Sequence, residues 1–482
     1  IRIELKRQGL TIHTLQNSVM KVERDEQGTL LAVHDPATAL DDRIRAESVI
    51  YIEIERCATA GGLKKIQNGL AGALAQVRAA VGDFPVMQQR LRDVINMLAD
   101  GQPGYFDESE RAEAMDFLQW LLADHFTFLG YERFAVNQGL AEQRLGVQPE
   151  HSLGVLALDQ WDDAIGNLPE AVVSYLQQPL LLSFAKASHF SRVHRPAYPD
   201  YVSIREVDAQ GQVLLEHRFM GLYTSKVYRD SVDRIPYLRR KVEQVRNELG
   251  LDPESHLGKE LDQTLQVLPR DDLFQMSPDV LRETAMGIVQ MQERARIRVF
   301  LRRGNYSRFY YCLVFVPRDL YSTDIRLKIQ TVLMDRLQAS ECEFWTYFSE
   351  STLTRTQFIL RVEPTRDQQE VDHQQIERDV IQACRDWHDD FRDRLEDSLG
   401  EAEASIAWAN FGNSFPAGYS ERFTTASAVV DLRHLLALSE NEPLGMSFYQ
   451  PLTQQQGVLH CKLYHLGEPL PLSDVMPILE NL

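Results

Sequence analysis

The chain is poor in the features that mark secreted and membrane-spanning proteins. It has five cysteines in 482 residues, an odd number in which no two are close enough for a CxxC pair. Neither a disulfide framework nor a cysteine-based zinc site is therefore expected. No apolar run reaches the ~18 residues that a membrane span needs, and no signal-peptide pattern opens the sequence. These absences predict a cytoplasmic protein that does not bind membranes.

Basic residues are also fewer than acidic residues. Lys and Arg number 51 against 70 Asp and Glu, which gives a formal net charge of −19. A surface of this sign repels phosphate backbones, so nucleic acid is not an expected partner. The densest basic cluster, residues 294–308, interleaves with aromatic residues. We interpret it as a contact between domains or subunits, with Arg302 and Arg303 as interface candidates.

Glycine-rich nucleotide motifs are missing as well, since neither G-x-G-x-x-G nor G-x-x-x-x-G-K-[ST] occurs. The Gly61-Gly62 pair opens a predicted helix, and we interpret it as a tight strand-to-helix turn. His373 and His388 lie in a charged helix without a second matched cluster, so no metal site is expected. A hydrolase would need a convergent His and Asp cluster that the spacing does not supply. The sequence offers no catalytic, cofactor-binding or metal-ligating residue.

Strand and helix patterns succeed each other along the chain. Strand-like residues 1–56 precede a helical stripe over 63–98, where Pro85 marks a break or a new helix start. A second unit combines a helix at 108–122, several strands and a helix at 231–249. Within it, Asp208 to Gly211 form a hairpin turn between strands 201–207 and 213–223.

A third sheet begins with a hairpin and then runs β-α-β-β-α, the order of a ferredoxin-like sheet. Its predicted elements are strands 296–301 and 309–316, helix 323–337, strands 341–348 and 356–362, and helix 374–395. Residues 252–294 and 400–456 read as mostly helical, and a last strand at 458–466 precedes a helix start. The fold class is therefore α+β, with small antiparallel sheets joined by helical connectors. Because the predicted units are cut at both ends of the sequence, we expect a fragment of a longer polypeptide.

Several segments, in this order, have distinctive amino-acid sequences. They are DHFTFLGYERF (124–134), SHLGKELDQTLQVLPRDDLFQ (255–275), GIVQMQERARIRVFLRR (287–303), RFYYCLVFVPRDLYSTDIRLKI (308–329) and LYHLGEPLPLSDVMPILENL (463–482). Together they cover nearly the whole chain. The chain resembles the N-terminal half of the large bacterial NAD-specific glutamate dehydrogenases, a regulatory region with ACT-like domains.

The resemblance, read with the patterns above, implies a series of modules. They are an ACT-like domain at 1–103 whose N-terminal part is missing, a second α+β domain at 104–250, a helical connector at 251–294, an ACT-like domain at 295–399, a helical connector at 400–456, and the start of a further, truncated ACT-like domain at 457–482.

The resemblance also implies a role. The parent enzyme would oxidise L-glutamate with NAD in glutamate catabolism, with NAD bound by a catalytic domain absent here. This segment would form homo-oligomers and transmit amino-acid effector binding allosterically. The alternative is a free-standing amino-acid-sensing ACT scaffold without enzyme activity.

ACT domains that bind effectors commonly use the loop after the first strand and the backbone amides of the following helix. Gly467 and Glu468 lie in such a loop, and Ser473 or Asp474 could cap the helix. A plain loop with a capped helix is the alternative. The matching loop of the third unit, 317–319, has no glycine, so we expect an interface role for Arg318.

Overall fold

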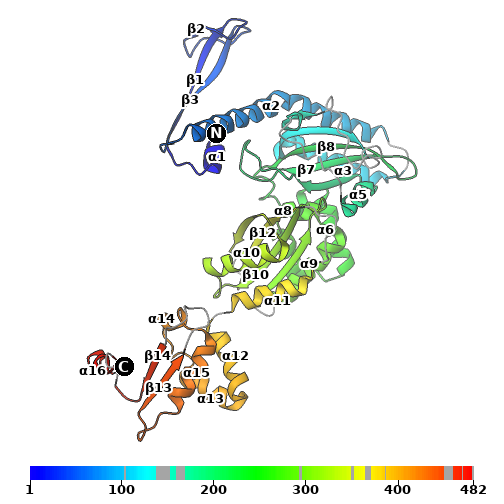
Figure 1. Cartoon of the computed structure of the whole chain (residues 1–482). Coiled ribbons are helices and arrows are strands. Elements are labelled where there is room, and N and C mark those ends of the chain that lie inside the picture. The colour runs from blue at the N-terminus through cyan, green and yellow to red at the C-terminus, as the bar shows by residue number, and fades with distance from the viewer. Residues whose placement is uncertain are drawn as a thin grey trace. The chain divides into compact units, whose positions relative to one another are not determined.

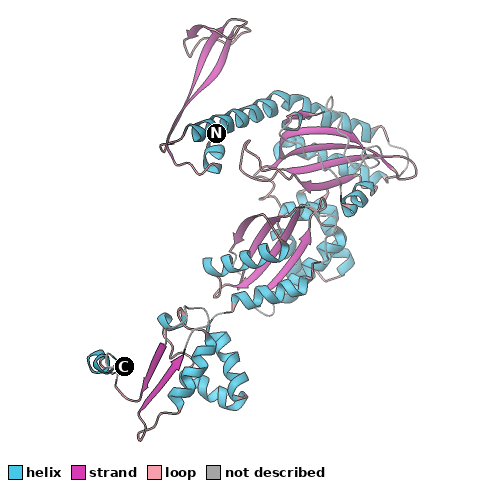
Figure 2. Cartoon of the chain, viewed as in Figure 1, coloured by secondary structure: helices cyan, strands magenta, loops and turns pink. Residues whose placement is uncertain are grey.

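The computed structural model describes residues 1–101, 105–136, 152–158, 169–292, 296–348, 352–363, 371–385, 387–449, 460–468 and 470–479. The chain divides into two compact units, Ile1–Arg326 with Gln330–Glu377, and Leu327–Ile329 with Arg378–Leu482. Each combines helices with small antiparallel sheets (Figures 1 and 2), which confirms the predicted α+β class. Three predicted domain boundaries, at 103, 294 and 456, lie outside the described residues.

The first unit opens with a helix, not with the strand that we predicted at Ile1. Helix α1 (Arg2–Arg7) is stabilised where Glu4 accepts hydrogen bonds from Arg7 and Gln8, three and four residues later. An antiparallel sheet follows in the order β2-β1-β3, formed by β1 (Ile12–Arg24), β2 (Leu30–His34) and β3 (Ile44–Ile54).

A single helix, α2 (Ala60–Ala99), follows this sheet and runs through Pro85, where we predicted a break or a new start. Thr59 caps it by accepting a hydrogen bond from the Gly62 amide at 3.1 Å, which agrees with a tight strand-to-helix turn. Ala80 and Met87, on either side of the proline, are both buried. Packing on both sides therefore holds the helix together across the missing N–H group.

Five antiparallel strands form the next sheet, in the order β5-β4-β8-β7-β6. The predicted turn between β7 and β8 is confirmed, because the Asp208 carboxylate accepts from the amides of Gln210 and Gln212. The strands are β4 (Phe126–Ala135), β5 (Leu153–Gly154), β6 (Leu182–Lys186), β7 (Asp200–Val207) and β8 (Val213–Tyr223), accompanied by helices α3 (Glu108–Trp120) and α5 (Glu170–Gln177).

Helices fill the stretch that follows this sheet. The helix predicted over 231–249 is shorter than expected, because its first turn is a separate 3-10 turn at Val232–Arg234 and Tyr237 has a φ of 69°. The α-helices are α6 (Leu238–Leu249), α7 (His256–Val267), α8 (Arg270–Gln275) and α9 (Pro278–Gln292).

The third sheet has the ferredoxin-like character that we predicted, with strand order β11-β12-β10-β9 and every pair antiparallel. Helix α10 (Thr323–Leu337) has the predicted bounds, because the Ser322 hydroxyl caps it at the Ile325 amide. The other elements are β9 (Arg298–Arg303), β10 (Phe309–Pro317), β11 (Glu341–Tyr347), β12 (Leu353–Arg361) and α11 (His373–Cys384).

The second unit corrects two predictions. The helix expected over 374–395 is divided, since α12 begins at Trp387, whose indole donates to the Phe423 carbonyl at 2.8 Å. The connector expected to be helical contains strand β13 (Leu444–Tyr449), which pairs with β14 (His460–His465). The helices are α12 (Trp387–Leu399), α13 (Glu401–Phe411), α14 (Ala417–Ser420), α15 (Thr425–Leu436) and α16 (Leu472–Leu479).

Candidate ligand sites

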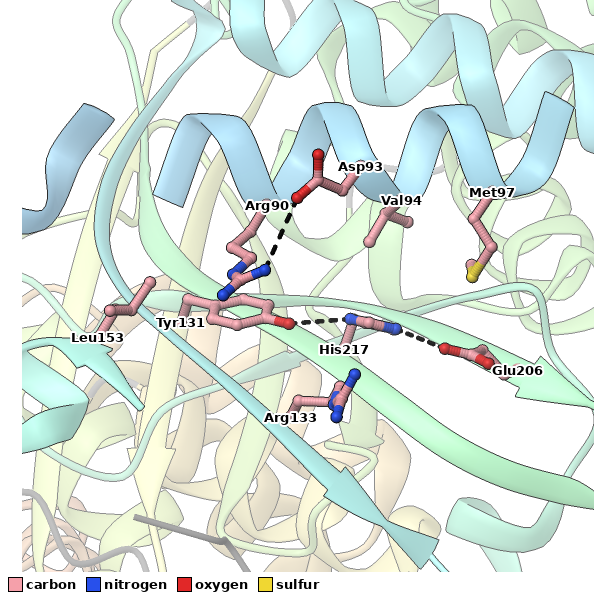
Figure 3. Close-up of a pocket in the computed structure, with 9 residues that line it drawn as sticks. All are labelled: Arg90, Asp93, Val94, Met97, Tyr131, Arg133, Leu153, Glu206 and His217. Atoms are coloured by element: carbon pink, nitrogen blue, oxygen red, sulfur yellow. Dashed lines mark hydrogen bonds and ion pairs between the residues drawn. The ribbon is translucent and has the colours of Figure 1, made fainter. Parts of the chain in front are cut away.

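A pocket of 270 Å³ lies between helix α2 and the five-stranded sheet (Figure 3). Four strands and one helix contribute to it, so its shape depends on the packing of α2 on the sheet. Its lining consists of Arg90, Asp93, Val94 and Met97 from α2, Tyr131 and Arg133 from β4, Leu153 from β5, Glu206 from β7, and His217 from β8.

A chain of hydrogen bonds crosses this pocket. The Tyr131 hydroxyl lies 2.9 Å from Nδ1 of His217, and Nε2 of His217 lies 2.7 Å from a Glu206 oxygen. The bond from His217 holds the pKa of Glu206 below its ordinary value, and burial raises the pKa of Tyr131. Both shifts keep the proton on the Tyr131 phenol and leave Glu206 as the ionised partner of His217.

Two guanidinium groups accompany this chain. Arg133 is half-buried and forms no close ion pair within the described residues, although its charge helps to lower the pKa of Glu206. Arg90 lies 3.7 Å from Asp93 in the same helix, and both side chains are about half exposed. Such exposed pairs contribute little. The pocket thus presents positive groups that are available to a ligand.

A second cavity, of 230 Å³, lies in the first unit between the β6–β7 end of the five-stranded sheet and the face of β11 and β12. At its centre Lys186 donates to Asp200 at 2.8 Å and to Asp271 at 3.1 Å, and the Tyr228 hydroxyl donates to Asp271 at 2.9 Å. Its lining also includes Arg195, Glu343, Trp345 and Tyr347.

The two carboxylates of the second cavity differ in their ionisation. Burial raises the pKa of Asp200 to about 7, whereas for Asp271 the attraction of Lys186 and the Tyr228 hydrogen bond outweigh burial and lower the pKa. Burial also raises the pKa of Glu343 to about 6. Because Lys186 is engaged by two carboxylates, we interpret this cluster as an internal link between elements.

A buried polar network ties the five-stranded sheet to the hairpin of β9 and β10. Arg218 donates to Glu132 and Glu216, each at 2.9 Å, and to the Tyr306 hydroxyl at 2.9 Å. Arg205, which is fully buried, donates to the other oxygen of Glu216 at 3.0 Å. Tyr306 lies between β9 and β10, so a shift of this hairpin must disturb charges inside the neighbouring sheet.

The predicted effector residues lie at the end of the chain. Gly467 has a φ of 100°, and a Cβ atom added there would meet nothing within 4 Å. The Glu468 carbonyl lies 2.9 Å from Nδ1 of His465. Helix α16 begins at Leu472, so Ser473 and Asp474 lie inside its first turn and not at the predicted cap position. The side chain of Asp474 lies outside the described residues.

The predicted interface arginines have different surroundings. Arg302 donates to Asp272 of α8 at 2.8 Å and stacks over the Tyr311 ring, with 4.2 Å to its centroid. Arg303 lies over the Tyr310 ring, and Arg318 is exposed after β10. Subunit contacts of all three stay a prediction, and residues 294–295 of the basic cluster lie outside the described residues.

Sequence reasoning missed both cavities, because their polar residues come from strands far apart in the chain. The pair of Glu206 and His217 had a usable signal. The predicted turn at 208–211 fixes the register of β7 and β8, in which Ile204 lies opposite His217 and Glu206 is its diagonal neighbour. Nothing in the sequence indicates that Tyr131, on β4, joins this pair.

The described residues do not fit a dinucleotide. All of the strand pairs in this part of the chain are antiparallel, whereas a dinucleotide fold needs a mostly parallel sheet with a glycine-rich turn. Within the same residues, no group of three or more His, Cys, Asp or Glu side chains could hold a metal ion. None of the helices described here has the length and apolarity that a bilayer crossing requires.

The structure therefore defines a region of small antiparallel α+β modules with two cavities of ligand size in its first unit. Five family models match the chain: "Glutamate dehydrogenase, ACT1 domain" over 1–70, "helical motif 1" over 235–294, "ACT2 domain" over 298–388, "helical motif 2" over 394–438 and "ACT3 domain" over 443–482. The matched ranges leave out residues 71–234, where the Figure 3 pocket lies.

Three relatives align with the full length of the chain. NAD-specific glutamate dehydrogenases of Pseudomonas aeruginosa, Halomonas elongata and Mycobacterium tuberculosis are 52%, 41% and 26% identical to it. The chain covers 30%, 30% and 29% of their respective lengths. It belongs to the family of NAD-specific glutamate dehydrogenases, as their N-terminal region of ACT domains and helical motifs, which confirms the resemblance.

Proposed function

We propose that the chain is the regulatory and assembly region of an NAD-dependent glutamate dehydrogenase. The enzyme would convert L-glutamate, NAD and water to 2-oxoglutarate, ammonia and NADH. The observation that carries the proposal is the ordered series of glutamate dehydrogenase models along a chain whose relatives bear that name. NAD and glutamate would bind in a further part of the protein, because the described residues lack a dinucleotide fold.

Regulation requires that an effector prefer one of two arrangements of the modules. The Arg218 network supplies a physical route, since the β9–β10 hairpin cannot move without breaking buried hydrogen bonds to the five-stranded sheet. The effector of this proposal is an amino acid that binds at the loop of Gly467 and Glu468. The enzyme would work in the cytoplasm as a homo-oligomer.

The full-length enzyme tests this function directly. Its rate of glutamate-dependent NAD reduction is measured with a panel of amino acids and compared with a version that lacks residues 1–482. We expect the shortened version to lose its effector response and to change its oligomer size. An unchanged rate, response and size would refute the regulatory role, and an intact protein without this activity would favour the free-standing scaffold.

A matched pair of glycine variants tests the effector loop. Gly467 and Gly28 have φ values of 100° and 84°, and an added Cβ meets nothing within 4 Å at either. Both valine variants therefore introduce similar local strain. We expect Gly467→Val to weaken the effector response and Gly28→Val to leave it intact. Equal responses in the two variants would remove Gly467 from the effector site.

A further inference from the structure

We propose that the pocket of Figure 3 binds a small dianion with carboxylate or phosphate oxygens, and that His217 takes up a proton when the dianion binds. The site is distinct from the predicted effector loop and lies in residues that none of the five matched ranges covers. The proposal goes beyond the proposed function, because it concerns binding and does not depend on the reaction.

The two guanidinium groups recognise the anion. Arg133 is half-buried on β4 without a recorded ion pair in the described part of the chain. Arg90 enters the pocket from α2, and its ion pair within the described part of the chain is the weak 3.7 Å contact with Asp93. A guanidinium group presents a planar fork of donors that matches carboxylate and phosphate oxygens. An anion between helix and sheet would therefore engage groups that are now poorly paired.

The size and walls of the pocket limit the ligand. A volume of 270 Å³ suits a small molecule, and Val94, Met97 and Leu153 give the pocket an apolar side. The other six of its nine lining residues are polar or charged, which favours a charged ligand over an apolar one. A short dicarboxylate or a phosphate has the charge that this site needs and is small enough for the cavity.

Charge balance explains why a proton accompanies the anion. Arg90 and Arg133 are balanced by Asp93 and Glu206, so the pocket has no net charge while His217 is neutral. Protonation of His217 makes it positive. The groups that face the imidazole are Tyr131 and Arg133 from β4, Glu206 from β7, and Arg90 and Asp93 from α2.

The hydrogen-bond chain permits this proton uptake without rearrangement. With a neutral imidazole, Tyr131 donates to Nδ1 and Nε2 donates to Glu206. With a protonated imidazole, both ring nitrogens donate, and the Tyr131 hydroxyl hydrogen becomes free to donate to the anion. A bound anion would place negative charge beside His217, so binding and protonation of the imidazole promote each other.

Calorimetric titration of the purified protein with succinate and, separately, with inorganic phosphate tests the proposal. For succinate, which stays mostly a dianion in this range, we expect binding to tighten as the pH falls from 8 to 6, by at most about tenfold per pH unit for one linked proton. Inorganic phosphate is compared with succinate at pH 8, where phosphate is also a dianion. Titrations in two buffers of different ionisation enthalpy measure the protons taken up. Binding of only one probe identifies the oxygen chemistry that the site prefers, whereas no binding of either probe at millimolar concentration overturns the proposal.

Variants assign the effect to the residues. Arg133→Gln should weaken binding at least about tenfold, because it removes a charge-assisted contact. The control is Arg92→Gln, which makes the same change on an exposed position of α2 outside the pocket, and it should leave binding unchanged. Equal binding by the Arg133 and Arg92 variants would refute the site.

His217→Gln should retain weaker binding but lose its pH dependence. Tyr131→Phe is a second, milder variant that removes only the hydroxyl, and it should also reduce proton uptake. A melting curve of each variant verifies that it is folded. Proton uptake equal to that of the unaltered protein in both variants would show that another group titrates, and the coupling to His217 would be wrong.

Discussion

The Arg218 network makes a quantitative prediction about stability. The Arg218 side chain is nearly fully buried and donates to Glu132, Glu216 and Tyr306. Substitution by methionine keeps much of the volume but leaves the carboxylates without this partner. Breaking a buried ion pair in this way costs about 3–5 kcal/mol. The five-stranded sheet and the β9–β10 hairpin should both lose stability.

Hydrogen exchange is the suitable assay, because a protein of several modules need not unfold in one step. A loss of 3–5 kcal/mol accelerates exchange roughly 150- to 5000-fold where global or subglobal opening controls it. We expect this acceleration at the amides of β8 and of the β9–β10 hairpin, and no change in α13 and α15. Arg92→Gln again serves as the control for loss of one positive charge.

The pH dependence of the stability lost in Arg218→Met tests whether this loss is electrostatic. Attraction to Arg218 and Arg205 outweighs burial and lowers the pKa of Glu216. Glu216 therefore stabilises the unaltered protein above its unfolded pKa, and this contribution is lost as the pH falls through the lower folded pKa. In Arg218→Met the buried carboxylates should protonate more easily, so the deficit should be smaller at pH 5 than at pH 7. A deficit below about 1 kcal/mol, or one that does not change with pH, would refute the reasoning.

Two further predictions concern single positions. Burial raises the pKa of Asp200 to about 7, so the contribution of this carboxyl group to folding stability is present below its unfolded pKa and is lost as the pH rises toward 7. Asp200→Asn should therefore flatten the fall in melting temperature between pH 4 and pH 7. An equally steep fall in the variant would contradict this origin. Gly154 has a φ of 65° and a ψ of −139°, and an added Cβ would lie 2.3 Å from the Leu129 carbonyl oxygen; Gly154→Ala should cost about 1–3 kcal/mol in urea unfolding, against no comparable loss for Gly61→Ala, where an added Cβ meets nothing.

Local signals predicted the elements that depend on neighbouring residues. The Ser322 cap and the helical period fix α10 at both ends, and the Asp208 turn fixes the β7–β8 hairpin. Prediction failed where distant contacts decide. The proline in α2 is tolerated because residues on both of its sides are buried, and α12 begins where the Trp387 indole reaches the Phe423 carbonyl. Sequence patterns do not contain such contacts.

The candidate pocket is likewise formed by contacts between residues that are far apart in the sequence. Its position on the long helix α2 suggests how a ligand could act at a distance. Arg90 and Met97 lie in the last third of α2, whereas the helix begins at Ala60, within the range matched by the ACT1 model. Near that end, Gly69 lets the Glu4 side chain of α1 lie against the helix. Forty residues of continuous helix extend about 60 Å. Because α2 is unbroken at Pro85, a ligand that drew Arg90 toward the sheet would also move the surface on which α1 packs.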